Sequence, residues 1–317
     1  MAIARIEAQA KLNLFLRILG READGFHQLE TLLQRVSLAD SIVVRTDVSG
    51  RSLECSETNV GPVEGNLAWR AALAYAEAAR WPDTFAIEIT KRIPVGGGLG
   101  GGSADAGATL RVLNALAPSP LPLETLFGVA RSLGSDVPFL TGDSPTALGL
   151  VRGDVIVACP PPSPRDVILL VPPFGVSSAE AFAWYAAAHV GDERKVSRLA
   201  TPASGIALAT VEAALAAQAT PGVTPARTEH GLSWREIGAL SGNDLQAVVV
   251  ERHPAIGTAV ALLRAAGAPV VQMTGSGSTV FGIFFSRPTG GMVAIQPGFT
   301  VLHAQTVTRV AEVEMVS

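Results

Sequence analysis

The most concentrated stretch of candidate chemistry is KRIPVGGGLGGGSADAG, at residues 91–107. Glycine lets backbone N–H groups come close to a ligand, and a helix N-terminus carries a partial positive charge. Together these properties suit a phosphate chain. Pro94 and Val95 constrain the entrance to the loop, and Ser103 is expected to cap an alanine-rich helix directly after it. We therefore interpret the stretch as an anion cradle rather than a flexible linker.

Familiar glycine fingerprints do not account for this loop. Gly96, Gly98 and Gly101 match the spacing of the dinucleotide fingerprint. The position about 20 residues later, where that fingerprint expects an acidic residue, falls instead in the proline-rich stretch 118–122. The Walker pattern fails because no Gly-Lys-Ser/Thr closes the loop. The His-Arg-Asp and Asp-Phe-Gly motifs of protein kinases do not occur. A nicotinamide-dependent oxidoreductase therefore remains an alternative function, supported only by this weak glycine motif.

Two charged side chains could assist a reaction beside a phosphate. Lys11 and Asn13 project from one face of an alternating segment, for which a solvated edge is the simpler interpretation. Asp136 follows a helix-ending Gly134 in GSDVPF, and an N-cap of the next turn is the simpler interpretation there. A carboxylate next to a lysine could accept a hydroxyl proton while the cation stabilises developing charge. The sequence does not establish that Lys11 and Asp136 meet.

Two further stretches have binding chemistry. Phe26 and His27 lie in DGFHQLET, where an aromatic face beside an imidazole would suit a planar base, although a lone histidine is more often a satisfied surface residue. MTGSGSTVF, at 273–281, is a tight glycine turn between two apolar runs. It fits a hairpin and an anion nest equally well.

Hydrophobic periodicity predicts the elements that must position these residues. Strands are expected at 6–18, 41–45, 84–90, 146–151, 155–159, 167–171, 270–273 and 279–285, with one or two more in 301–315. Helices are expected at 67–79 after an Asn66 cap, and at 103–116, 123–133, 178–188, 243–251 and 255–266, with a short turn after Asp136. The order of 201–225 is left open. Four prolines within 160–164 predict a boundary between domains at 1–160 and 161–317.

Composition narrows the class of protein. The chain has 317 residues, 48% of them hydrophobic and 16% charged, which is enough apolar material for a sizeable core. A net charge of −4 without a dense basic tract argues against nucleic acid as a partner. The two cysteines suit neither a disulfide framework nor a zinc site. Charges in the first 20 residues exclude an ordinary secretory signal, and no stretch suits a membrane span, so a cytoplasmic protein is expected.

Three motifs, AKLNLFL, PVGGGLGGGSADA and MTGSGSTVF, occur in an order that resembles the GHMP kinase superfamily from about residue 8 to 282. The resemblance implies an α/β (α+β) fold of two domains. The N-terminal domain would resemble the second domain of ribosomal protein S5, and the C-terminal domain would be ferredoxin-like. It also implies ATP with Mg²⁺ as co-substrate and no tightly bound cofactor.

The same resemblance assigns roles by position. Lys11 and Asp136 match the catalytic pair, and Asn13, Phe26 and His27 fall where the family holds its substrate. Phe182, with Trp184 as the other candidate, would cover the base from the C-terminal domain. The ATP site would comprise Asn66 together with Pro94, Val95, Gly96, Gly97, Gly98, Leu99, Gly100, Gly101, Gly102, Ser103 and Ala104.

Within the superfamily, ADGFHQLETLLQ, NLAWRAA and GSDVPF are similar to kinases of the non-mevalonate isoprenoid route. That similarity implies phosphorylation of the 2-hydroxyl of 4-(cytidine 5′-diphospho)-2-C-methyl-D-erythritol. Where the family usually has tyrosine and a second serine, this chain has Phe26, which loses a phenol hydrogen bond, and Ala104, which loses a hydroxyl. The alternatives are another GHMP alcohol kinase of the mevalonate, homoserine or sugar type, and a catalytically silent relative. The oligomeric state is not predicted.

Overall fold

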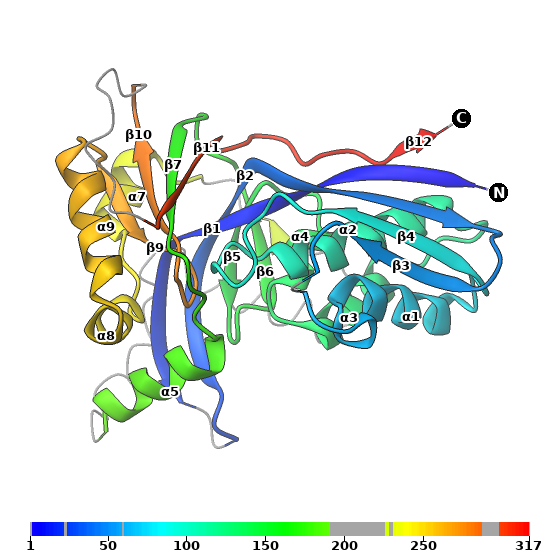
Figure 1. Cartoon of the computed structure of the whole chain (residues 1–317), viewed down its shortest axis with the longest axis horizontal. Coiled ribbons are helices and arrows are strands. Elements are labelled where there is room, and N and C mark those ends of the chain that lie inside the picture. The colour runs from blue at the N-terminus through cyan, green and yellow to red at the C-terminus, as the bar shows by residue number, and fades with distance from the viewer. Residues whose placement is uncertain are drawn as a thin grey trace.

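A computed structural model describes residues 2–21, 24–58, 60–190, 226–227, 231–286 and 298–316. Two sheets organise these residues (Figure 1). The larger sheet has the strand order β12-β1-β2-β5-β6-β8, and β4 also pairs with β2 and, in parallel, with β3. Its strands are β1 (Ile3–Arg21), β2 (His27–Thr46), β3 (Arg51–Cys55), β4 (Phe85–Thr90), β5 (Thr146–Leu150), β6 (Val155–Cys159), β8 (Ala226–Arg227) and β12 (Glu314–Val316).

β1 and β2 form the long antiparallel ribbon that connects the two ends of the molecule. Three register shifts interrupt their pairing, the first between Gln9 and Lys11 and the second between Asn13 and Phe15. The even positions of β1 from Ala4 to Ile18 are buried, as the alternation predicts. The solvated-edge interpretation of the odd face is wrong, because Lys11 and Asn13 are each only 3% exposed. The glycine loop and the turn after β9 cover this part of β1, which local alternation does not reveal.

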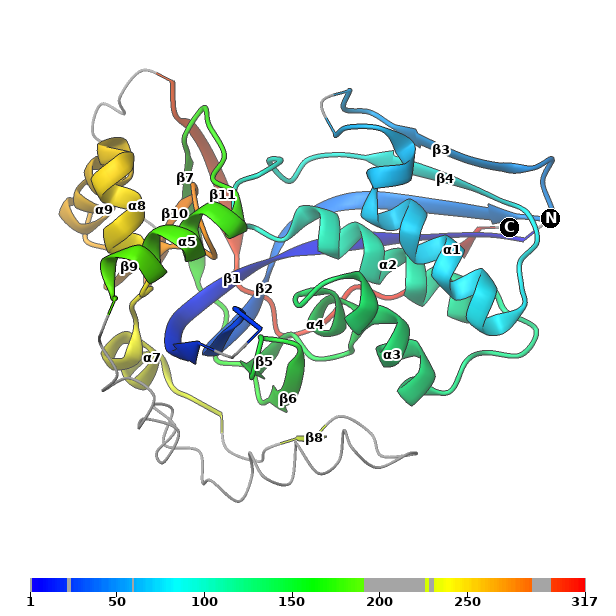
Figure 2. The same ribbon diagram turned by 90° about the horizontal axis from the view of Figure 1, so that it is seen from below.

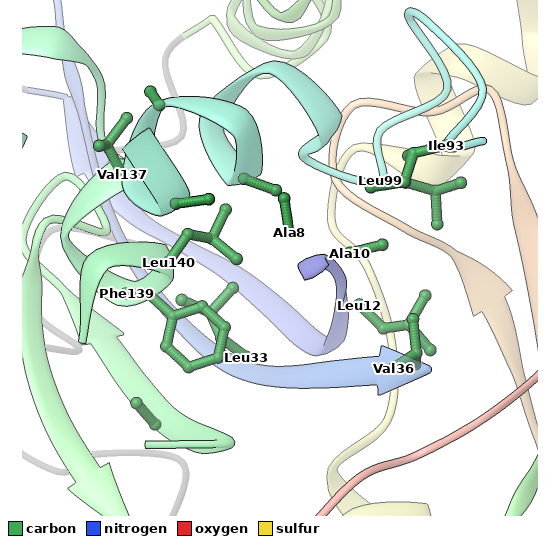
Figure 3. Packing of buried hydrophobic residues seen from close by; sticks show 14 of the residues in the cluster. Ala8, Ala10, Leu12, Leu33, Val36, Ile93, Leu99, Val137, Phe139 and Leu140 are labelled. Atoms are coloured by element: carbon green, nitrogen blue, oxygen red, sulfur yellow. The ribbon is translucent and has the colours of Figure 1, made fainter. Parts of the chain in front are cut away.

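Helices cover one face of the larger sheet (Figure 2). They are α1 (Leu67–Ala79), α2 (Gly101–Leu116), α3 (Leu123–Leu133) and the short α4 (Val137–Thr141), preceded by the 3₁₀ turn η1 (Val63–Gly65). The core between these helices and the sheet is built mostly from small and aliphatic side chains. Ala8, Ala10 and Leu12 of β1 belong to this core together with Phe139 and Leu140 of α4 (Figure 3). Burial of this apolar surface holds α4 against the sheet.

The second sheet has the order β11-β7-β10-β9. Its strands are β7 (Asp166–Val171), β9 (Val270–Met273), β10 (Val280–Phe284) and β11 (Thr300–Gln305). The helices of this half are α5 (Ser178–Ala188), α7 (Trp234–Leu240), α8 (Gln246–Arg252) and α9 (Pro254–Ala265). A second apolar cluster lies between this sheet and helices α5, α8 and α9.

The expected elements are confirmed with adjusted ends, apart from the following differences. β2 is one long strand, of which the sequence predicts only 41–45, and β3, η1, β8 and α7 were not predicted from the sequence. The α2 N-cap is Gly100, at a φ of +73°, so the expectation that Ser103 caps this helix is wrong. Residues 201–225 lie outside the described part of the chain.

The mixed α/β fold is confirmed, whereas the division at residue 160 stays a prediction. Every strand of the second sheet follows residue 160, but β12 returns to pair with β1 at the far end of the larger sheet. Among the described residues, no helix combines the length and the apolar character needed to cross a membrane.

Candidate active site

Lys11 and Asp136, which are far apart in the sequence, meet in the structure. Lys11 Nζ lies 3.3 Å from Asp136 Oδ2. The lysine side chain is 4% exposed and the aspartate side chain 30%, so the carboxylate is the accessible member of the pair. Asp136 occupies the N-cap position of α4, but its side chain makes no capping hydrogen bond. The capping interpretation therefore accounts for its place in the chain and not for its side chain.

Close packing of α4 on α2 fixes the position of Asp136. Gly107 of α2 lies so near α4 that an added Cβ would come within 2.6 Å of the Leu140 carbonyl carbon. Any larger residue at 107 would push the two helices apart.

A buried network orients Lys11. Its ammonium donates to Asn13 Oδ1 at 2.7 Å, and Asn13 Nδ2 donates to Thr31 Oγ1 at 2.9 Å. The Thr31 hydroxyl in turn donates to the Phe15 carbonyl at 2.6 Å. From the second sheet, Thr274 Oγ1 contacts the Asn13 amide oxygen at 3.3 Å. Because each of these groups has a partner, the ammonium is held in one direction.

The glycine loop runs past this pair into the N-terminus of α2. Gly96, Gly98 and Gly100 all have positive φ, between +73° and +76°, a conformation that favours glycine. The Lys11 backbone N–H donates to the Leu99 carbonyl at 3.0 Å, which ties the loop to β1. Ser103 lies within the first turn of α2, and Ala104 is buried in the core.

The TGSGS turn is a β9–β10 hairpin that supports the loop. An added Cβ at Gly98 would lie 2.3 Å from the Thr274 carbonyl oxygen and 2.8 Å from that of Gly277, so the two turns touch backbone to backbone. The Thr279 N–H donates to the Gly97 carbonyl at 3.1 Å. Of the two interpretations that the sequence left open, the hairpin is confirmed.

Three cavities surround these residues in a row. One of about 300 Å³ is lined by Asn66 and the loop from Pro94 to Gly102. A central cavity of about 250 Å³ contains Lys11, Asn13 and Asp136 and shares the loop glycines with the first. A third, of about 700 Å³, is lined by Phe26, His27 and Phe182. The central and outer cavities share Leu29, Ser135, Arg152, Ser178 and Phe182.

The outer cavity contains the predicted residues Phe26, His27 and Phe182. Phe182 stacks on His27, with ring centroids 5.1 Å apart and an interplanar angle of 22°. Phe26 is 57% exposed and lies under the Arg152 guanidinium. Partial burial, and then the positive charge of Arg21, lower the pKa of His27, which favours a neutral ring that can both donate and accept hydrogen bonds. The centroid of the Trp184 ring lies 6.0 Å from that of His253, with the rings tilted by 45°, and Trp184 does not line this cavity.

Asn66 has a structural role alongside its place in the first cavity. Its side chain accepts a hydrogen bond from the Ala68 N–H at 2.9 Å, which caps α1 as the sequence predicts.

A second lysine cluster, which the sequence reasoning missed, lies on the other flank of the loop. Lys91 Nζ donates to Asp105 Oδ2 at 2.7 Å and also to Asp40 Oδ2. Burial raises the pKa of Asp105 to about 7, with the Asp40 carboxylate adding to the rise and Lys91 opposing it. Burial alone would lower the pKa of Lys91, but the two carboxylates outweigh it and raise that pKa. The signal in the sequence was a lysine directly before the glycines and an aspartate inside the following helix.

Comparisons with known proteins agree with this arrangement. Residues 66–143 match the family described as GHMP kinases N terminal domain, and residues 229–291 match GHMP kinases C terminal. A 4-diphosphocytidyl-2-C-methyl-D-erythritol kinase of Desulfotalea psychrophila is 38% identical over 282 residues, covering 88% of this chain and 85% of the relative. The kinase of the same name from Heliobacterium modesticaldum is 35% identical, covering 92% and 89%.

Solved structures extend the likeness to the fold. A crystal structure of 4-(cytidine 5′-diphospho)-2C-methyl-D-erythritol kinase superposes with a TM-score of 0.66 at 31% identity, covering 95% of this chain and 98% of that one. A homoserine kinase from Cytophaga hutchinsonii, at 18% identity and a TM-score of 0.63, covers 99% and 97% and shares the fold. With both family domains matched and curated relatives aligned over most of its length, the chain belongs to the GHMP kinases.

Proposed function

We propose that this chain transfers the γ-phosphoryl group of MgATP to the 2-hydroxyl of 4-(cytidine 5′-diphospho)-2-C-methyl-D-erythritol. The observation that carries the proposal is the row of three cavities with the Lys11–Asp136 pair in the middle one. A nucleotide on one side and a base-linked alcohol on the other would meet at that pair. The names of the relatives, at 35–38% identity over most of the chain, supply the substrate.

Lys11 and Asp136 would act on the accepting hydroxyl. Asp136 is partly exposed to the central cavity, so its carboxylate can accept or orient the hydroxyl proton. Lys11 is held by Asn13 and cannot swing away, so its charge would stabilise the oxyanion or the transferring group without reorganisation. Holding both groups beside the hydroxyl lowers the entropy cost of the transfer.

The glycine loop would bind the β- and γ-phosphates. Its backbone N–H groups and the positive end of α2 supply the attraction, and the TGSGS turn holds the loop in place. Magnesium in phosphoryl-transfer sites is commonly held by the substrate phosphates and one or two carboxylates, a requirement that Asp136 fits. When bound, the ion would neutralise charge on the phosphates.

Phe26, His27 and Phe182 would recognise the cytosine. An exposed phenylalanine offers a face for stacking, and a neutral histidine can bond the polar edge of the ring. Since Phe182 stacks on His27, it would have to turn away to cover a bound base.

A direct assay tests the proposed function. The purified chain is incubated with MgATP and either the CDP-linked alcohol, mevalonate, homoserine or galactose, and ADP release is measured. The expected result is ADP release with the CDP-linked alcohol and at least about 100-fold lower kcat/KM for the other three. Preference for one of the other alcohols would instead identify a different GHMP kinase, because such substrates carry no base for the outer cavity. ADP release with none of the four would overturn the proposal.

A further inference from the structure

One residue at the junction of two cavities has no role in the function proposed so far. Arg152 lies in the turn between β5 and β6, in the segment VRGDV. Its side chain lines both the central cavity, next to the Lys11–Asp136 pair, and the outer cavity that contains Phe26 and His27. Of the five residues shared by the two linings, Arg152 alone carries a charge.

The chemistry of the junction favours an anion. Lys11 and Arg152 are the two cationic side chains among the described residues that line the central cavity. The Lys11 ammonium is already engaged with Asn13 and Asp136. The hydroxyls of Ser135 and Ser178 belong to the same junction and add donors.

The guanidinium is also held in place on the outer side. Arg152 forms an ion pair with Asp24. Its guanidinium carbon lies 4.1 Å from the centroid of the Phe26 ring, which places the cation on the ring face. The pKa of Asp24 is lowered first by the backbone N–H of Phe26 and then by Arg152, so this carboxylate stays ionised and keeps the pair intact.

We propose that Arg152 is the residue that binds the diphosphate group of the substrate, and that its stacking on Phe26 couples diphosphate recognition to base recognition. The inference rests on the proposed function, in which a diphosphate joins a base in the outer cavity to an alcohol in the central one. A chain that connects the two must pass the junction where Arg152 lies. A planar guanidinium can bond two phosphate oxygens at once, and it provides enough donors to bond a carboxylate as well.

The first test compares substrate kinetics of Arg152→Ala with those of Arg45→Ala. Arg45 is a matched control, because it also pairs with a carboxylate, that of Glu88, and has a similarly exposed side chain, 31% against 35% for Arg152. Arg152→Ala is expected to raise KM for the CDP-linked alcohol about 10-fold or more, with kcat and KM for ATP changed less than about 2-fold. Arg45→Ala is expected to leave all three constants unchanged.

The second test separates diphosphate binding from support of Phe26. Cytidine, CMP and CDP are measured as competitive inhibitors against the CDP-linked alcohol at saturating MgATP. For the unaltered chain, inhibition should strengthen from cytidine to CDP, and Arg152→Ala should flatten this series by about 10-fold. Phe26→Leu should weaken all three inhibitors, cytidine included, because it removes the stacking face for the base. It should weaken CDP somewhat more, because the Arg152 guanidinium loses the ring against which it lies.

The outcomes distinguish this inference from the proposed function. If the unaltered chain does not phosphorylate the CDP-linked alcohol, the proposed function fails and the inference fails with it. If it does phosphorylate this substrate, but the inhibitor series is equally steep with and without Arg152, only the inference is overturned. An Arg152→Ala variant that weakens cytidine as much as CDP would overturn it as well, since that result assigns Arg152 to the support of Phe26.

Discussion

Two buried lysines flank the glycine loop, and their surroundings differ. An added Cβ at Gly100 would lie 3.0 Å from the Lys11 side chain, and one at Gly101 would lie 3.3 Å from Lys91 Nζ, so the loop passes close to both. Lys11 has one carboxylate partner, which is 30% exposed and lines a cavity. Lys91 has two, with side chains that are 0% and 5% exposed.

This difference in access separates two uses of the same chemistry. A lysine–carboxylate pair whose carboxylate is exposed in a cavity can act on a ligand. The cluster of Lys91, Asp40 and Asp105 also borders the first cavity, but its carboxylates have almost no exposed surface, so this enclosed cluster suits a structural role. The Asp40 carboxylate also accepts the Ile93 N–H at 2.8 Å, so the enclosed cluster anchors the strand that leads into the loop. The Lys91 cluster therefore holds the segment that leads into the loop, whereas the Lys11–Asp136 pair on the other flank lines the central cavity.

The largest effect is expected from breaking the enclosed cluster. Lys91→Met leaves two buried carboxylates without their cation, which should lower the free energy of unfolding by about 3–5 kcal/mol. Urea denaturation followed by circular dichroism measures this loss. Arg5→Met removes an exposed pair with Glu314 and should cost less than about 1 kcal/mol. Equal losses in the two variants would contradict the structural role of Lys91.

Removing the charge of the accessible carboxylate should act on turnover instead. Asp136→Asn is expected to lower kcat about 100-fold or more, because the hydroxyl loses its proton acceptor, while ATP and the CDP-linked alcohol still bind. Steady-state kinetics and calorimetric titration measure the two effects. Asp166→Asn, which changes a surface carboxylate of β7 that accepts from Gln305, is the matched control. Near-normal turnover of Asp136→Asn would show that Asp136 is not catalytic.

The enclosed cluster should also give stability a pH dependence. Because the pKa of Asp105 is raised to about 7 in the folded chain, the folded state binds a proton more tightly than the unfolded state does. This group therefore stabilises the folded state at low pH, and its contribution to the free energy of unfolding is lost as the pH rises from about 4 towards 7. In Asp105→Asn, which has no carboxyl group at this position, that pH-dependent decrease should be absent.

The measurement is urea denaturation of Asp105→Asn and the unaltered chain at several pH values. The stability of the variant relative to the unaltered chain should rise between pH 5 and 8, by on the order of 1 kcal/mol. If the free energies of unfolding of the two proteins changed in parallel with pH, Asp105 would be ionised throughout this range. The predicted pH dependence of the enclosed cluster would then be wrong.

The smallest expected effect is that of the accessible pair on stability. Asp136→Asn keeps an oxygen that can accept from Lys11, and the lost charge is partly exposed, so its free energy of unfolding should change by less than about 1 kcal/mol. A loss as large as that of Lys91→Met would mean that access does not separate the two pairs.

Much of the fold could be predicted because its signals are local. Asn66 caps α1 through its own side chain, and Gly134 ends α3. The strands of the second sheet follow from apolar runs bounded by turns. The length of β2 was missed because its pairing with β1, β4 and β5 is non-local. Ser103 was mistaken for a cap because a glycine at positive φ begins α2 instead.

The candidate site divides in the same way. Local patterns specify the residue types, namely a glycine cradle before a helix, a lysine on an alternating strand and an aspartate before a short turn, since each depends on neighbours a few positions away. Which of these residues meet depends on packing between distant parts of the chain. Lys11 and Asp136 are brought together by the packing of α4 on α2 and the sheet. Lys91 and Arg152 acquire partners that are far away in the chain, Asp40 and Asp24 respectively. Such contacts arise from burial of surface across the whole fold, and no local pattern encodes them.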